Sequence, residues 1–218
     1  MDEARRIPMG TVGAPSWVIA KRQSGGRGRR GRQWTSPVGN LQATACFSFG
    51  GPMRDLPQLC LLAGVATCEA LVAVQPAVAG RLILKWPNDV LLDQRKLAGV
   101  LVESDVESRS ANVRIGFGVN LVPVTEEPDR RSHIDGVTPR ELILALDAAL
   151  TALLEDWTAN GFAPIGRKWE RWAPAIGSAI APSALKGVTA SYAGLAGDGS
   201  LLVDTDAGRL TVSSGELV

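Results

Sequence analysis

The chain has 218 residues, 45% of them hydrophobic, which allows one globular domain with a real core, with or without a small appendage. Lys and Arg number 23 against 22 Asp and Glu, and the formal net charge of +1 argues against a bulk nucleic-acid binder or an acidic tail.

The charges are unevenly distributed along the chain. Residues 4–54 hold nine basic residues and no acidic one, whereas residues 55–218 hold 14 basic and 20 acidic residues. A nearly neutral protein therefore carries one strongly cationic segment, and this segment is where we look for function. No apolar run approaches the roughly 20 residues of a membrane helix, and the N-terminus does not resemble a signal peptide. We therefore expect a cytoplasmic protein without a membrane partner.

Cysteine and histidine usage excludes several kinds of site. Cys46, Cys60 and Cys68 form no CxxC pair and sit among apolar neighbours, which predicts buried reduced thiols and argues against structural zinc. His133 is the only histidine, which argues against a Ser-His-Asp triad or a two-histidine metal site within this chain. Its polar surroundings predict a solvated loop residue.

The hydrophobic pattern of the first half predicts strands around one helix. A short strand at 17–22 leads into a loop at 23–40 that is rich in glycine and arginine. Residues 41–49 alternate apolar and polar, as in a half-buried strand. Helical spacing after Pro57 predicts a helix to about residue 74. Four further strands, the middle two joined by a tight hairpin, are predicted at 81–86, 90–92, 96–103 and 112–119.

The second half begins with a strong helix start. Thr138 can cap the helix, Pro139 occupies its first turn, and Glu141 completes a capping box. We expect the helix to end near Asn160, where Gly161 suits a left-handed C-terminal cap. A second helix is predicted at 162–173.

Short apolar runs separated by glycines follow from Ile176 onward. They predict about five short strands with tight turns, which form a small barrel or a curled sheet. We place the domain boundary near 174–177, so that the domains are 1–175 and 176–218.

A first cluster of chemistry-bearing residues lies in the loop at 23–34. It places four arginines within six residues, and glycines allow its backbone to approach a ligand closely. Guanidinium groups match phosphate and carboxylate oxygens, and Trp34 adds a flat face for stacking on a base. On these grounds a solvated basic loop is as good an interpretation of the tract as nucleotide and nucleic-acid binding taken together. It is not a Walker A loop.

Two further motifs carry polar or unusually small residues. Lys85-Trp86-Pro87-Asn88-Asp89 ends a strand with an ammonium, an amide and a carboxylate, which fits an anionic substrate with Mg²⁺ or an ordinary polar turn. Gly116 and Gly118 lie inside a predicted strand, and Gly99 lies on a nearby one. Glycines inside strands mark close approach, so we expect a sheet face cleared of side chains for a flat apolar ligand.

These three motifs, in this order, closely resemble those of biotin protein ligases, also called biotin–[acetyl-CoA-carboxylase] ligases. The resemblance is clear over about residues 16–121. It implies an α+β fold with a mixed, largely antiparallel sheet, helices on one face and a small C-terminal SH3-like β-barrel. It also implies a two-step reaction, in which biotin and MgATP give biotinyl-5′-AMP and diphosphate, and a carrier lysine then displaces AMP. No tightly bound cofactor is expected beyond these substrates.

The resemblance also implies roles for individual residues. Lys85 and Arg29 are the expected catalytic residues, with Lys85 stabilising charge on the α-phosphoryl oxygens rather than acting as a nucleophile. Asp89 is the expected Mg²⁺ ligand. The residues expected to bind biotin are Gln23, Gly26, Arg27, Gly28, Arg29, Lys85, Gly99, Gly116 and Gly118. The residues expected to bind ATP or the adenylate are Arg27, Arg29, Arg30, Arg32, Trp34, Asn88 and Asn120.

The sequence departs from the family pattern at its start. Members usually begin the ligase domain with an apolar strand that ends in Asp-Ser-Thr, whereas Met1–Arg6 resembles the helix after that strand. Either the start codon is assigned too late or the chain is truncated, and we expect biotin affinity and the sheet edge to be affected.

The expected partner is the biotin carboxyl carrier domain of acetyl-CoA carboxylase or of another biotin-dependent carboxylase, and a homodimer stays open. Nucleic acid is not an expected partner. The alternatives are a lipoate- or octanoate-transferring relative on the same fold and a nucleic-acid-binding module that uses the arginine tract. The loop at 23–40 is expected to be mobile without ligand, because its clustered cations lack partners, and to order on adenylate binding.

Overall fold

The computed structural model describes residues 1–108, 110–124, 129–185 and 187–217. Its main sheet has six strands in the order β1-β2-β6-β5-β4-β3, and every neighbouring pair is antiparallel. The prediction of a large, mainly antiparallel sheet is therefore confirmed. The strands are β1 (Ser16–Ile19), β2 (Leu41–Phe49), β3 (Leu82–Lys85), β4 (Asp89–Leu92), β5 (Arg95–Val106) and β6 (Ala111–Val119).

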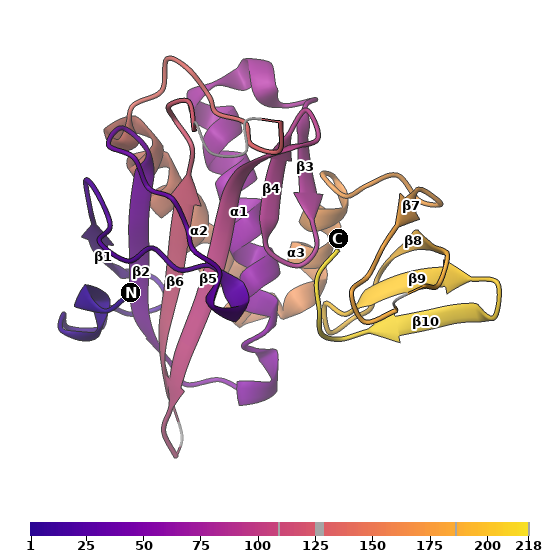
Figure 1. The fold of residues 1–218 in the computed structure, drawn as a ribbon. Helices are drawn as coiled ribbons and strands as arrows, with labels where there is room; N and C mark the ends of the chain where they lie inside the picture. The colour runs from indigo at the N-terminus through magenta and orange to yellow at the C-terminus, as the bar shows by residue number, and fades with distance from the viewer. Residues whose placement is uncertain (109, 125–128, 186, 218) are drawn as a thin grey trace.

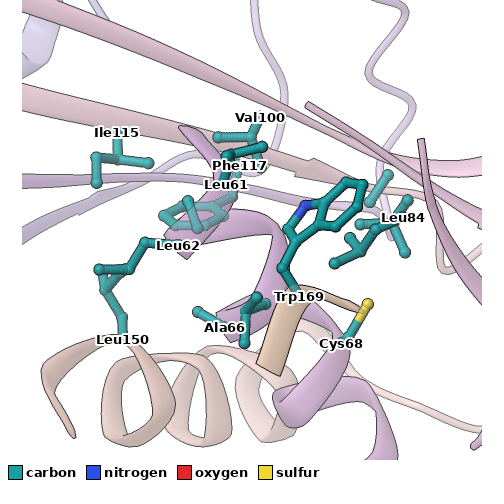
Figure 2. Close-up of a cluster of buried hydrophobic side chains, with 14 of the residues drawn as sticks. Leu61, Leu62, Ala66, Cys68, Leu84, Val100, Ile115, Phe117, Leu150 and Trp169 are labelled. Carbon is teal, nitrogen blue, oxygen red and sulfur yellow. The ribbon is translucent and has the colours of Figure 1, made fainter. Parts of the chain in front are cut away.

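Three α-helices lie on one face of the main sheet, as predicted (Figure 1). They are α1 (Gln58–Val74), α2 (Pro139–Asn160) and α3 (Phe162–Glu170). Helix α1 is buried on most sides because it packs against the sheet, α2 and α3 together. Figure 2 shows this core, in which Leu62 of α1 lies near Leu150 of α2 and Phe117 of β6. No helix in the described ranges is long and apolar enough to span a bilayer.

The predicted capping box at the start of α2 is present. Thr138 Oγ1 accepts a hydrogen bond from the Glu141 amide at 3.2 Å, and Glu141 Oε2 accepts one from the Thr138 amide at 2.9 Å. Gly161 ends the helix with φ 71° and ψ −162°, which is a positive-φ cap but not the left-handed helical one that we predicted. This extended geometry turns the chain directly into α3.

Strand β2 differs from the prediction of a half-buried strand. Its polar side chains Gln42 and Thr44 are buried as well as its apolar ones. The N-terminal segment covers part of this second face, with Met1 Sδ 3.7 Å from Thr44 Oγ1. The helix expected at residues 1–6 is reduced to one 3₁₀ turn, η1 (Glu3–Arg5). The other 3₁₀ turns are η2 (Arg29–Gly31), η3 (Met53–Asp55) and η4 (Pro76–Val78).

The C-terminal region forms a second, four-stranded antiparallel sheet in the order β10-β9-β8-β7. The prediction named about five strands, whereas the described residues contain four in this sheet, and closure into an SH3-like barrel stays a prediction. The strands are β7 (Ala179–Ile180), β8 (Ala190–Leu195), β9 (Leu201–Thr205) and β10 (Gly208–Val212). Trp86 at the end of β3 donates its indole N–H to the carbonyl of Gly199 at 3.2 Å, which joins the two sheets.

Candidate functional site

A cavity of about 800 Å³ lies on the face of the main sheet that the α-helices leave free. Polar strand positions such as Gln42 and Thr44 line it, while their apolar neighbours Leu41 and Ala45 point into the core. The alternation of side chains along each strand therefore divides the sheet into a core face and a cavity face. The loop at 23–40 forms the opposite wall.

One row of residues crosses the floor of this cavity through five strands. Lys85 of β3 pairs with Asp89 of β4, Asp89 with Gly99 of β5, Gly99 with Gly118 of β6, and Gly118 with Gln42 of β2. Residues paired across a sheet project from the same face, so this register aligns an ammonium, a carboxylate, two bare glycines and an amide. The structure thus brings the second and third motifs together.

The cleared glycine floor is covered by the indole of Trp34. A Cβ atom on Gly118 would lie 2.5 Å from Trp34 Cε2, and one on Gly99 would lie 3.4 Å from Trp34 Cζ3. Lys96 Nζ stands 5.5 Å and Arg131 Cζ 5.4 Å from the ring centroid of Trp34, close enough for cation–π attraction. Gly118 is therefore needed for a close approach, whereas a Cβ atom at Gly99 would meet Trp34 at an ordinary distance. In this structure the approaching group is Trp34, and the predicted flat ligand stays a prediction.

Arg29 joins the basic loop to the second motif. Its Nη1 donates to Asn88 Oδ1 at 3.3 Å, and its Nη2 donates to the carbonyl of Gly215 at 2.8 Å. Asn88 Nδ2 in turn donates to the carbonyl of Val100 at 2.9 Å, which fixes the amide against β5. Arg29, Asn88 and Lys85 all line the cavity, so the cations of the first and second motifs face the same cavity.

The other cations of the loop have acidic partners. Arg27 Nη2 lies 2.6 Å from Asp2 Oδ1, and Arg30 Nη1 lies 3.3 Å from Glu216 Oε1. Arg32 also forms an ion pair with Glu216. Our expectation of loop mobility assumed that clustered cations lack partners, and this premise is wrong because distant carboxylates supply them. Whether the loop moves without ligand stays a prediction.

Most of the predicted site residues gather around the cavity, and three do not line it. Those that line it are Gln23, Arg27, Gly28, Arg29, Arg32, Trp34, Lys85, Asn88, Asp89, Gly99, Gly116 and Gly118. Gly26 packs closely against Gln23 and the backbone of Trp34. Arg30 lines a second cavity, of about 650 Å³, between the start of α1 and the second sheet.

Asn120 is the third predicted residue outside the cavity lining. It is fully buried, accepts a hydrogen bond from Asn40 Nδ2 at 3.2 Å and donates one to the carbonyl of Ser132 at 3.1 Å. Asn40 Oδ1 also accepts from the amide of Leu121 at 2.8 Å. These contacts connect the end of β6 to the start of β2. The side chain of Asn120 therefore holds these two strand ends together and does not face the cavity.

Sequence reasoning missed several residues that line the cavity, chiefly Gln42, Lys96 and Arg131. Lys96 Nζ lies 2.6 Å from Asp89 Oδ1, so the expected metal ligand is held in an ion pair. Gln42 belongs to the polar face of the alternating strand at 41–49, and this was the signal that could have found it. Arg131 follows a segment without a periodic pattern, and no comparable signal marked it.

The donor set near Asp89 fits a metal ion that arrives with a ligand. No group of three or more His, Cys, Asp and Glu side chains suited to a metal occurs in the part of the chain that the structure describes. Asp89 and Asn88 offer one carboxylate and one amide oxygen at the cavity wall. Mg²⁺ is commonly bound through one or two carboxylates together with substrate phosphates and water, so these residues fit that mode.

The thiols of the chain are poorly suited to chemistry. All three cysteines are free, as predicted; Cys46 and Cys68 are buried, and Cys60 is partly buried. Burial raises the pKa of Cys60 to about 12 and also raises the pKa of Cys46. The thiolate is the reactive form, so these residues are not nucleophile candidates at neutral pH.

Comparisons with known proteins point to one family. Residues 3–120 match the model of the biotin/lipoate A/B protein ligase family. The chain is 34% identical over 231 residues to the biotin–[acetyl-CoA-carboxylase] ligase of Paracoccus denitrificans, which covers 99% of this chain and 94% of that protein.

Two solved structures resemble the whole fold. Biotin protein ligase from Aquifex aeolicus, in complex with biotin and ATP, aligns with a TM-score of 0.78 and 28% identity over 97% of this chain and 89% of that one. The enzyme from Leishmania major, in complex with biotinyl-5-AMP, aligns with a TM-score of 0.63 and 25% identity over 93% of this chain and 90% of that one.

Proposed function

The chain belongs to the biotin/lipoate A/B protein ligase family, and from this premise we propose that it is the ATP-dependent ligase that attaches biotin to a carrier protein. Biotin and ATP are its substrates, and the acceptor is a lysine of the biotin carboxyl carrier domain of acetyl-CoA carboxylase or a related carboxylase. The observation that carries the proposal is the register row from Lys85 through Gly99 and Gly118, which joins a cationic end to a bare floor.

In the first step a carboxylate oxygen of biotin attacks the α-phosphorus of ATP, and diphosphate leaves. This transfer needs two anions to meet, so positioning and charge neutralisation supply most of the rate. Lys85 and Arg29 line the same end of the cavity and would hold the carboxylate and the α-phosphoryl oxygens together. Neither group has to gain or lose a proton in this step.

The remaining site residues would divide between the two halves of the adenylate. Gln23, Gly28 and the floor at Gly99, Gly116 and Gly118 would bind biotin once Trp34, whose indole covers this floor, moves to stack on adenine. Arg30 and Arg32 would hold phosphate oxygens once they leave Glu216. Asn88 and Asp89 would hold the magnesium ion carried by ATP, and that ion would neutralise charge on the phosphate oxygens.

In the second step the amine of the carrier lysine attacks the acyl carbon of the mixed anhydride, and AMP leaves with the electrons of the broken C–O bond. The amine loses a proton as the amide forms. The only histidine of the sequence, His133, does not line the cavity, so the leaving phosphate or water would accept this proton. The region 176–218 would act as a separate C-terminal domain beside the site, and a homodimer stays open.

The experiment that tests the proposal is a carrier biotinylation assay. The purified chain is incubated with biotin, MgATP and a biotin carboxyl carrier domain, and the intact mass of the carrier is measured. A gain of one biotinyl group that requires ATP and the acceptor lysine is expected; a carrier with that lysine changed to arginine is the control. Modification by lipoate or octanoate in place of biotin would instead favour the related transferase.

A further inference from the structure

We infer that Gln42 is a ligand-binding residue, and that its side-chain N–H₂ group donates a hydrogen bond to an acceptor on a planar ring of the bound substrate. This inference rests on the proposed function, which supplies two candidate rings, the ureido ring of biotin and the purine of ATP. Both carry acceptor atoms at their edges, either the ureido oxygen or a purine nitrogen.

Trp34 fixes the orientation of the Gln42 amide. The indole Nε1 donates to Gln42 Oε1 at 3.2 Å. An indole N–H can only donate, so the oxygen of the amide must face Trp34 and the nitrogen must point the other way. The opposite assignment, with the two atoms exchanged, would bring two donors together.

The nitrogen of this amide is buried, and no acceptor contacts it among the described residues. Gln42 is 1% exposed, and its Nε2 has no hydrogen-bond partner within the residues that the structure describes. Leaving a buried donor unpaired is unfavourable, so native structures rarely keep one without a reason. Because Gln42 also lines the cavity, an acceptor on a bound molecule is the partner that its position allows.

The position of Gln42 selects a flat ligand. Its register partner is Gly118, where a Cβ atom would lie 2.5 Å from Trp34 Cε2. Gln42 therefore stands at the edge of a floor that only a thin group can approach, and a ligand ring would take the place that the Trp34 indole fills here. Across the cavity, Gln23 Oε1 is a buried acceptor that also lacks a partner among the described residues. A planar ring that offers both an acceptor and an N–H donor would satisfy both amides, and the ureido ring and the amino purine both meet this requirement.

The test is calorimetric titration of the wild type and of Gln42→Leu. One series uses biotin, and the other uses ATP with Mg²⁺ in the presence of saturating biotinol, an alcohol that cannot be activated. The affinity of one ligand should fall roughly ten- to hundredfold, as expected for a lost buried hydrogen bond, while the other changes less than about twofold. Ser48→Ala, on the same face of β2 at its exposed end, is the control and should change neither affinity.

Ligand analogues identify the acceptor atom. If biotin is the affected ligand, 2-iminobiotin should bind the wild type more weakly than biotin does. Gln42→Leu should bind the two compounds with the same affinity. If ATP is the affected ligand, we use ATP analogues in which one purine nitrogen is replaced by carbon. One of these analogues should bind the wild type more weakly than ATP does and bind Gln42→Leu as well as ATP does. An unchanged affinity for both substrates, or an equal loss for both, would overturn the inference.

A second variant separates ligand binding from a role in holding Trp34. Trp34→Phe keeps a flat ring but cannot donate to Gln42. If Gln42 only positions Trp34, Gln42→Leu should add nothing in the Trp34→Phe background, and this result would also overturn the inference. If Gln42 contacts the ligand, the additional loss should persist. A wild type that binds neither substrate would refute the proposed function itself, so the two failures are distinguishable.

Discussion

Lys85 and Gln42 stand at opposite ends of one register row that crosses five strands of the main sheet, with Gly99 and Gly118 between them. Four strand spacings separate the backbones of the two residues by roughly 19 Å. The row therefore has a charged end for reacting groups and an amide end for a ring. This separation suits a long substrate that is held at both ends.

The bare floor predicts a sharp steric effect at Gly118. A methyl group there would lie 2.5 Å from Trp34 Cε2, so Gly118→Ala must displace the indole or be displaced by it. Interiors tolerate such overpacking poorly, and we expect the affinity for the adenylate to fall at least roughly tenfold, measured by calorimetry. Gly80→Ala is the matched control, because a Cβ atom at Gly80 meets no atom within 4 Å. Wild-type affinity in Gly118→Ala would contradict the close approach.

The sequence predicted the floor but not its surroundings. The alternation at 41–49 gave both ends of β2 correctly, and the glycines of the third motif marked a close approach because strand interiors seldom contain them. The same alternation placed Gln42 on the polar face of β2, but it escaped notice because the pairing of β2 with the distant β6, which sets Gln42 beside Gly118, leaves no local pattern. Asn120 was expected in the pocket for the converse reason, since only the tertiary structure reveals that its amide is already satisfied by Asn40 and Ser132.

Glu216 predicts an opposing effect on nucleotide binding. Its carboxylate pairs with Arg30 and Arg32, two arginines that we expect to hold phosphate oxygens. Phosphates must compete with it, so Glu216→Gln should lower the KM for ATP by about two- to fivefold at low ionic strength, with little change at high salt. Asp206→Asn is the control, because Asp206 is exposed in the turn between β9 and β10. A higher KM for ATP would instead mean that Glu216 positions the arginines for binding.

The same ion pairs make a prediction about the loop itself. Arg27 and Arg30 have side chains that are 50% and 56% exposed, so trypsin can reach the loop when it opens. When the adenylate binds, the arginines of the loop would contact it in place of their carboxylate partners. The loop should then be held more tightly, because one ligand contacts several of its residues. We expect trypsin to cleave the loop more slowly in the presence of biotin and MgATP. Mass spectrometry of the fragments measures the rate. Equal cleavage with and without ligand would speak against ordering of the loop.

Asp105 predicts an acid-dependent contribution to stability. Hydrogen bonds from Arg114 and then from Arg5 hold the pKa of its carboxyl below the ordinary value of 3.8. A lowered pKa contributes stability that is present above the ordinary value and is lost as the pH falls through the folded-state value. Arg114 is buried, with 5% of its side chain exposed, so its guanidinium depends on this partner.

Thermal unfolding of Asp105→Asn measures this contribution. The variant should melt below the wild type at every pH from 7 to 5, and the difference should disappear as the pH falls below about 3.8. Asp206→Asn again serves as the control for removing an exposed carboxylate. A difference that grows on acidification would show that the sign of the linkage is wrong.

The most direct test of the central claim is whether the protein forms biotinyl-5′-AMP without a carrier. The diphosphate released in this step is measured in the wild type and in Lys85→Ala. The account predicts biotin-dependent diphosphate release in the wild type and a loss of roughly a hundredfold or more in Lys85→Ala, with an unchanged circular dichroism spectrum. Arg29→Ala should behave alike, whereas Lys168→Ala, which removes an ammonium paired with Glu69 on the helical face, should retain activity. Near-normal adenylate formation by Lys85→Ala would contradict the account.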